Sequence, residues 1–209
     1  MGLGNPGPVY ELSRHNVGFQ VIDGLADRHG VKLDSHRYGS LWGRAWIGGE
    51  EVFLVKPEMY MNHSGVAVQA WLSSLEISPS RVVVVHDDLD LPLGRLRVRK
   101  GGGDGGHRGV RSIMAELGSG DFLRVKVGIG RPPKEGFAVE HVLEPFPEPE
   151  ALAIAAALSQ AREAVEVLIG EGLEAAMNRF NVRPGKREGH SERAILSSSE
   201  TINNREKEV

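Results

Sequence analysis

The chain has 209 residues, of which 40% are hydrophobic and 25% charged, the ordinary balance of a globular protein. It contains no cysteine, which excludes a disulfide framework, a thiolate nucleophile and a thiolate-bound zinc ion. The longest apolar run, Ala151 to Leu158, is far shorter than the roughly 20 residues of a membrane span. A secretory signal begins with basic residues, but none precedes Arg14 in this chain. We therefore expect a soluble, cytoplasmic protein with no membrane partner.

The net charge of −3 conceals a basic, glycine-rich segment. Between residues 94 and 134, ten Lys and Arg residues stand against three Asp and Glu, a local charge of +7 that leaves −10 for the rest of the chain. Such a segment in an acidic protein indicates a phosphate-bearing partner. A solvated basic face with flexible turns explains the charge equally well.

Helical and strand-like patterns alternate in the first half of the chain. In chain order we expect a turn at residues 4–8, a helix from Asn16 to Gly30, a hairpin of residues 42–47 and 51–55 around two glycines, and a helix capped by Ser64 that ends near Leu75.

The second half begins with a run of four valines at residues 82–85, typical of a strand buried on both faces. It ends in His86, Asp87 and Asp88, at the strand edge where open α/β sheets bind ligands. Further expected elements are strands at 96–98 and 123–129 with basic outer faces, a glycine loop at 101–106, a helix from His107 to Gly118, and a helical region at 150–180 interrupted near residue 171.

These elements predict one α/β domain, which we assign to residues 1–183. The remaining residues, 184–209, are polar and offer few groups to bury, so we expect a disordered tail there.

The familiar hydrolase and phosphate-loop motifs are missing: there is no Gly-x-Ser-x-Gly and no loop ending in Gly-Lys-Ser/Thr. A metal site is an alternative, because His86, Asp87, Asp88 and Asp90, with His107 downstream, carry ligating atoms. The competing interpretation is that these acids cap helices or pair with nearby arginines.

His15 has the features of a site residue, because it lies between the glycine-proline turn and the first helix. Asn5, Asn62 and the amides of the glycine loop are neutral donors for a developing oxyanion. A histidine base, a carboxylate that orients it and neutral donors, without a nucleophile, suit direct attack by water on an ester or a similar acyl bond.

Five motifs of the chain resemble those of the bacterial peptidyl-tRNA hydrolases, in the family's order and spacing and over residues 2 to about 180. They are Gly2-Leu3-Gly4-Asn5-Pro6-Gly7, Arg14-His15-Asn16, Tyr60-Met61-Asn62-x-Ser64-Gly65, His86-Asp87-Asp88-Leu89-Asp90-Leu91-Pro92 and Gly101-Gly102-Gly103-x-Gly105-Gly106-His107.

The resemblance implies a single α/β domain with a twisted mixed β-sheet flanked by helices. It implies a hydrolase of the translation system that cleaves the ester between a peptide, or an N-blocked amino acid, and the 3′ ribose of tRNA, and so recycles peptidyl-tRNA from stalled ribosomes. No metal, cofactor or covalent intermediate takes part. The expected partner is peptidyl-tRNA, bound through its 3′ CCA end and acceptor stem by a monomer without a stable protein partner.

The resemblance also assigns roles to single residues. His15 is the general base for water, Asp87 orients it, and Asn5 distinguishes N-blocked from free aminoacyl-tRNA. The residues expected on the substrate and tRNA side are Tyr10, Tyr60, Met61, Asn62, His107 and Arg108. For Met61, simple packing is the alternative.

The chain departs from the family at four places. Arg108 replaces an asparagine that contacts tRNA, Asp104 stands where histidine is frequent, and His63 stands where an apolar residue is frequent. The first strand is short, which indicates either a truncated strand or a start codon further upstream.

Two other functions remain as alternatives: a non-catalytic RNA-binding relative of the same fold, and a metal-dependent phosphoesterase. The retention of His15, Asp87, Asn5 and Asn62 argues against a binding-only protein, which needs neither the base nor the residue that orients it. We expect Arg108 to contact a tRNA phosphate; an arginine folded over solvent is the alternative.

Overall fold

The computed structural model describes residues 1–134 and 136–181, so the expected tail at 184–209 lies outside the described residues. The helices are α1 (Val17–Arg28), α2 (Ser64–Leu75), α3 (Arg108–Leu117), α4 (Ala138–Leu143), α5 (Ala151–Gly170) and α6 (Leu173–Phe180). The strands are β1 (Ser35–Arg37), β2 (Ser40–Ile47), β3 (Glu50–Pro57), β4 (Val83–Asp88), β5 (Leu96–Lys100) and β6 (Leu123–Gly128). Short 3-10 turns are η1 (Arg14–Asn16), η2 (Met61–His63), η3 (Pro79–Arg81) and η4 (Glu148–Glu150).

The strands form two three-stranded sheets, ordered β1-β2-β3 and β4-β6-β5. The first sheet is antiparallel throughout. The second is mixed, because β4 and β6 are parallel and β5 and β6 are antiparallel. The expected α/β class with mixed strand pairing and flanking helices is confirmed, although the strands are divided between two sheets.

The first three residues join the two sheets. Gly2 N–H donates to Val55 O of β3 at 3.0 Å, and Leu3 N–H donates to Val85 O of β4 at 2.9 Å. The Met1 amine donates to Val83 O at 2.7 Å. This joint carries the chain directly to Asn5.

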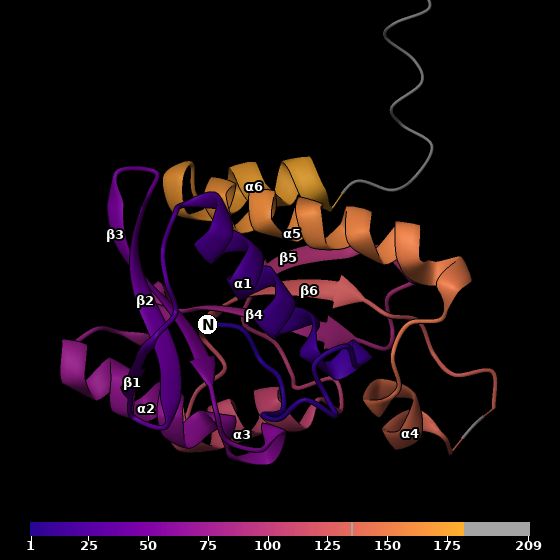
Figure 1. Cartoon of the computed structure of the whole chain (residues 1–209). Helices are drawn as coiled ribbons and strands as arrows, with labels where there is room; N and C mark the ends of the chain where they lie inside the picture. The colour runs from indigo at the N-terminus through magenta and orange to yellow at the C-terminus, as the bar shows by residue number, and fades with distance from the viewer. Residues whose placement is uncertain (135, 182–209) are drawn as a thin grey trace, which may run out of the picture.

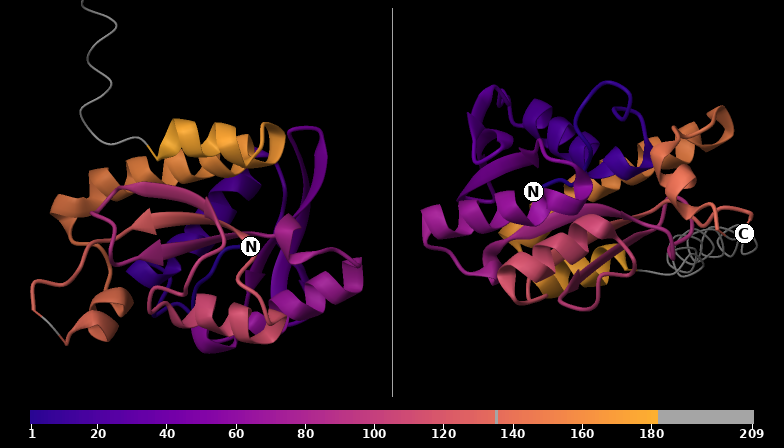
Figure 2. Two further views of the ribbon diagram at one scale, coloured as in Figure 1. Left: turned by 180° about the vertical axis from the view of Figure 1, so that it is seen from behind. Right: turned by 90° about the horizontal axis from the view of Figure 1, so that it is seen from below.

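Helices cover both faces of the sheets, so the fold has three layers (Figures 1 and 2). α1, α5 and α6 pack on one face over a core that contains Val21, Val125 and Leu168. α2 and α3 pack on the other face over a second core that contains Val84 and Ile113. α4 lies apart, beside the ends of the strands (Figure 1).

Most of the expected elements are present, including the interruption between α5 and α6 and the end of α3 at Gly118, which has a φ of 62°. Two expected caps are wrong. Asn16 donates and accepts toward Asn5 instead of capping α1, and Ser64 is the first residue of α2, its hydroxyl donating to Met61 O. α4 and β1 had no counterpart in the sequence prediction.

The expected basic outer face of β6 is also wrong. Arg124 is completely buried and Lys126 nearly so, at 0% and 8% exposure. Lys126 Nζ donates to Asp88 Oδ2 at 2.6 Å, and Arg124 donates to backbone carbonyls. Within the described part of the chain, no helix is long and apolar enough to cross a membrane.

One side chain, that of Asn181, hydrogen-bonds to the outer edge of β5, and this contact leads to a first prediction. Asn181 Oδ1 accepts from Val98 N–H at 2.7 Å, and its Nδ2 donates to Val98 O at 2.9 Å. Asn181→Ala leaves both backbone groups of a buried residue unpaired, so we expect a loss of about 1 to 3 kcal/mol in the free energy of unfolding. Urea denaturation measures it. Asn181→Asp keeps only the acceptor, so its free energy of unfolding should lie between those of Asn181→Ala and the wild type. Equal stability of Asn181→Ala and the wild type would contradict a stabilising role of these two hydrogen bonds.

Candidate active site

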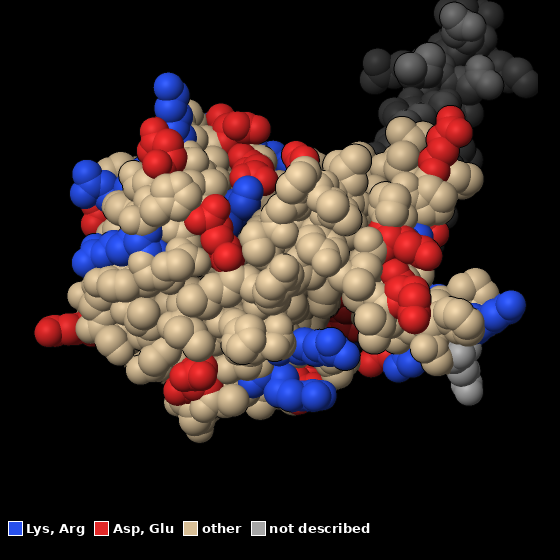
Figure 3. Space-filling model, turned by 60° about the horizontal axis from the view of Figure 1, so that its bottom comes forward, with Lys and Arg blue, Asp and Glu red and all other residues tan. Residues whose placement is uncertain are grey.

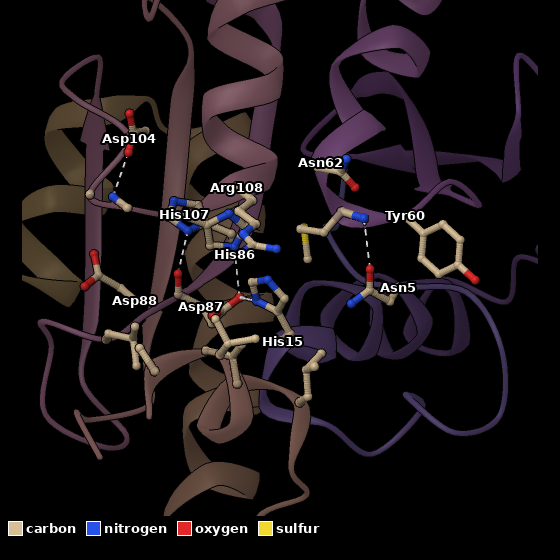
Figure 4. A pocket seen from close by; sticks show the side chains of 18 of the residues that line it. Asn5, His15, Tyr60, Asn62, His86, Asp87, Asp88, Asp104, His107 and Arg108 are labelled. Carbon is tan, nitrogen blue, oxygen red and sulfur yellow. Dashed lines mark hydrogen bonds and ion pairs between the residues drawn. The ribbon is translucent and has the colours of Figure 1, made fainter. Parts of the chain in front are cut away.

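A cavity of about 440 Å³ opens where β4, η1, η2, the glycine loop and α4 meet (Figure 4). Every site residue predicted from the sequence lines it: Asn5, Tyr10, His15, Tyr60, Met61, Asn62, Asp87, His107 and Arg108. The opposite wall, which the sequence did not reveal, is apolar and consists of Leu89, Ala138, Val139, Val142 and Leu143.

His15 and Asp87 form a buried pair at the base of the cavity. His15 lies in η1, and Asp87 is the second-last residue of β4. Their exposures are 7% and 2%. His15 Nδ1 is 2.8 Å from Asp87 Oδ1. Since a carboxylate can only accept, Nδ1 carries the proton and donates it. The lone pair of His15 therefore lies on Nε2, where it can accept a proton.

His107 approaches the same carboxylate oxygen from the start of α3 (Figure 4). Its Nδ1 accepts from the N–H groups of Gly109 and Val110 at 3.1 and 3.2 Å, which caps the helix. Nδ1 is therefore unprotonated, and Nε2–H donates to Asp87 Oδ1 at 2.9 Å. The structure thus places His107 in contact with Asp87, in addition to a place in the cavity wall.

The two histidines keep the Asp87 carboxyl ionised. Burial alone would raise its pKa, but the nearby His15 and His107, and the hydrogen bonds that they donate, lower the pKa well below its ordinary value. A permanent negative charge here favours a positive charge on His15, which a base acquires when it takes a proton.

Asn5 is oriented by the backbone around it. Its Oδ1 accepts from Met61 N–H at 2.9 Å, which leaves the N–H groups of Nδ2 to the cavity, on the side where His15 lies (Figure 4). Asn16, which the sequence predicted as a helix cap and not as a site residue, holds the Asn5 backbone: its Oδ1 accepts from Asn5 N–H at 2.8 Å and its Nδ2 donates to Asn5 O at 3.0 Å. Its position directly after His15 was the available signal.

Arg14 is a second residue that the sequence reading did not assign. It is 4% exposed, donates to Pro145 O at 2.8 Å and forms an ion pair with Glu150 at 3.1 Å. Because Arg14 directly precedes His15, these contacts hold η1 against the segment that follows α4.

The acids at the strand end each bind a cation or a histidine, and only Asp90 pairs with an arginine, as the competing interpretation of the metal motif predicted. Asp88 pairs with Lys126 and Asp90 with Arg131. His86 Nδ1 donates to Asp87 O at 2.6 Å, and burial lowers the pKa of His86 well below its ordinary value. The five residues named for a metal therefore do not converge. Among the described residues, His15, Asp87 and His107 have ligating atoms close together, and these atoms bind one another.

The basic segment is partly neutralised within the fold. Lys100, Arg111, Lys126 and Arg131 form ion pairs with acids, and Arg124 is buried. Arg97, Arg99 and Arg108 have no ion-pair partner in the described part of the chain. In Figure 3, basic side chains gather below the hollow in the surface and acidic ones to its right.

A buried histidine–aspartate pair in an open cavity at the end of a strand is an arrangement that can activate water for hydrolysis. The family profile described as peptidyl-tRNA hydrolase matches residues 1–189. The chain is 48% identical over 182 residues to the peptidyl-tRNA hydrolase of Moorella thermoacetica, covering 87% of this chain and 96% of the relative. It is 45% identical over 181 residues to that of Frankia alni, covering 87% and 92%.

The fold agrees with this similarity. The crystal structure of peptidyl-tRNA hydrolase from Acinetobacter baumannii superposes with a TM-score of 0.82 at 36% identity, covering 87% of this chain and 92% of the other. The chain belongs to the peptidyl-tRNA hydrolase family, and it is a hydrolytic enzyme.

The low pKa of Asp87 predicts how stability depends on pH. A carboxyl whose folded pKa is depressed stabilises the fold above its unfolded pKa, near 3.9, and this contribution is lost as the pH falls through the folded pKa. We therefore expect the stability difference between wild type and Asp87→Asn to shrink by about 1 kcal/mol between pH 5 and pH 3. Chemical denaturation at both pH values measures it. An equal difference at both would mean that Asp87 titrates alike in the folded and unfolded states.

Proposed function

We propose that this enzyme hydrolyses the ester that joins a peptide, or an N-blocked amino acid, to the 3′ ribose of tRNA, with His15 as the general base. The observation that carries the proposal is the fixed tautomer of His15, whose Nδ1–H is held by Asp87. His15 Nε2 takes a proton from water, and the water oxygen attacks the ester carbonyl carbon. The bond to the ribose 3′ oxygen breaks, and His15 returns the proton to this departing oxygen, which becomes the 3′ hydroxyl. No metal or covalent intermediate is needed for these steps.

Asn5 supports both catalysis and substrate selection in this proposal. The free N–H groups of its Nδ2 are neutral donors for a carbonyl oxygen of the substrate or for the developing oxyanion. A free α-ammonium group can only donate, so it finds no acceptor in the Asn5 Nδ2 group. An N-acyl group has a carbonyl oxygen that accepts from it. Asn5 therefore distinguishes N-blocked from free aminoacyl-tRNA.

The RNA part of the substrate fits the rim of the cavity. Tyr10, Tyr60 and Asn62 lie there, and Tyr60 is 61% exposed, as a stacking partner for an unpaired 3′ base requires. Arg97 and Arg99 of β5 and Arg108 of α3 are cations left free for phosphates. We infer that the 3′ CCA end enters the cavity and that the acceptor stem lies over these arginines.

The cellular setting follows from this substrate. The residues proposed for catalysis and for the 3′ CCA end line one cavity, and we propose that the enzyme acts as a monomer without a stable protein partner. Recycling of peptidyl-tRNA belongs to translation, so we propose that the enzyme acts in the cytoplasm.

His15→Ala tests the mechanism. A general base typically contributes a factor of 10² to 10⁴ to the rate, so we expect a loss of kcat in that range, with tRNA affinity and melting temperature nearly unchanged. The assay is hydrolysis of N-acetylated aminoacyl-tRNA after treatment with a chelator. His63→Ala, which removes an exposed histidine of η2, is the matched control and should retain full activity.

The same assay separates the alternative functions. Loss of wild-type activity on chelation would support the metal-dependent phosphoesterase, and tight tRNA binding without any hydrolysis would support the binding-only relative. A His15→Ala variant with half of the wild-type rate would exclude His15 as the base.

Arg108→Asn tests the contact to RNA. Arg108 is exposed in the first turn of α3, where a cation opposes the helix dipole at a cost of roughly 0.3 to 1 kcal/mol, which a bound phosphate would offset. We expect the variant to raise KM, to reduce the log–log salt slope by about 0.7 to 0.9, and to leave kcat nearly unchanged. Steady-state kinetics over a series of KCl concentrations measures all three. A lower kcat with an unchanged salt slope would instead assign Arg108 to the reacting ester.

A further inference from the structure

Arg124 occupies an unusual position for an arginine. It lies in the middle strand of the second sheet, its side chain is completely buried, and its guanidinium stacks on the Phe122 ring with 4.4 Å between Cζ and the ring centroid. Burial lowers the pKa of Arg124, but a guanidinium remains charged in proteins. A buried charge is costly unless it is paired, so the contacts of this one indicate what it does.

The partners of the guanidinium are three backbone carbonyls and the sulfur of Met114, to which Nη2 donates at 3.7 Å. Nη1 donates to Gly103 O at 2.7 Å, and Nη2 donates to Gly102 O at 2.7 Å and to Gly120 O at 3.3 Å. Among the described residues, no carboxylate forms an ion pair with Arg124, and its Nε has no hydrogen-bond partner. The cation is therefore balanced by the carbonyl dipoles of one loop and of the residue that leads toward β6.

That loop, residues 101–106, has few other contacts; at its start, Gly101 N–H donates to Phe122 O at 3.0 Å. Five of its six residues are glycines, and Gly102 and Gly106 have φ values of 100° and 81°, a region that only glycine adopts readily. Asp104 is its one side chain; it accepts from Gly106 N–H at 2.7 Å and pairs with Arg111 at the surface. An exposed ion pair contributes little, so the buried Arg124 is the stronger anchor.

The loop continues without a break into His107. His107 N–H donates to Asp104 O at 3.1 Å, and the His107 ring lies between the start of α3 and the Asp87 carboxylate (Figure 4). The direction of the loop therefore sets where the ring enters the site. A chain of contacts leads from Arg124 through the glycine loop and His107 to Asp87, and from there to His15.

We propose that Arg124 is a positioning residue for hydrolysis: by clamping the carbonyls of Gly102 and Gly103 it holds the glycine loop so that His107 Nε2–H stays on Asp87. This inference rests on the proposed function, in which Asp87 orients the base. Arg124 touches neither substrate nor the reacting atoms. Its effect is on the alignment of Asp87 and His15, and thus on kcat.

The test compares Arg124→Met and Arg124→Lys with Arg111→Met in the full chain. Arg124→Met fills the same space without donors, and Arg124→Lys keeps the charge but not the planar fork that spans two carbonyls. We expect kcat to fall about 10-fold to 100-fold in Arg124→Met, the loss that a displacement near 1 Å causes, with KM changed less than threefold. Arg124→Lys should fall between Arg124→Met and wild type. Arg111→Met removes the exposed anchor of the same loop and should keep most of the activity.

A spectroscopic measurement separates positioning from general loss of stability. In ¹⁵N-labelled protein, the ring nitrogens of His107 report the Nε2–H tautomer and its hydrogen bond to Asp87, and this signal should be weakened or lost in the Arg124 variants and kept in Arg111→Met. Val165→Ala, a core change in α5, should lower the melting temperature without moving the signal or kcat. If Arg124→Met does not fold, Arg124→Lys carries the measurement.

Two results would overturn the inference: a folded Arg124 variant with wild-type kcat, or a reduced kcat with the His107 signal unchanged. Failure of the proposed function is distinguishable, because it would appear as activity in His15→Ala, whereas the effect of Arg124 on the His107 ring needs no turnover.

Discussion

A single oxygen atom, Asp87 Oδ1, accepts hydrogen bonds from two histidines that lie 72 and 20 residues away in the chain. The active site depends on this shared acceptor. It fixes the tautomer of His15, ties the first turn of α3 to the end of β4, and keeps a negative charge in a place where burial alone would favour the neutral acid. Other contacts place side chains around this oxygen: Asn16 holds the backbone of Asn5, and the helix cap of α3 holds the His107 ring.

The middle strand of the second sheet supports the same site from behind. Arg124 and Lys126 are two residues apart in β6 and so lie on the same face, toward α2 and α3. Lys126 holds Asp88, the neighbour of Asp87, and Arg124 holds the loop that leads into His107. Buried cations in a sheet are costly, and here both are used to fix backbone segments that border the cavity.

The sequence predicted the parts of the fold that depend on local patterns. The hairpin around Gly48 and Gly49, the buried strand of valines and the helix between His107 and Gly118 all carry their signals within a few residues. Of the cavity residues, Asn5, His15, Asn62, Asp87 and His107 stand out in the sequence itself, whereas Tyr10, Tyr60, Met61 and Arg108 come only from the family resemblance.

Features that depend on distant neighbours were not predicted. Arg124 and Lys126 alternate with valines as exposed basic residues would, and only the packing of the glycine loop and Asp88 above them explains their burial. Asn16 has the composition of a helix cap, but a closer backbone, that of Asn5, takes its side chain. α4 has only six residues, too few for a clear helical pattern in the sequence, and it is held by the hydrogen bond that Arg14 donates to His141 O.

The joint formed by Met1 to Leu3 has a consequence for folding kinetics. The β2–β3 hairpin closes through a two-residue turn, whereas the joint pairs Met1 with Val83, 82 positions away, a contact that forms slowly because a long loop must close first. Asn5 follows the joint, and Asp87 belongs to the second sheet. We therefore expect these two residues to come together during refolding only once the joint has formed, so that catalytic activity returns no earlier than this long-range contact.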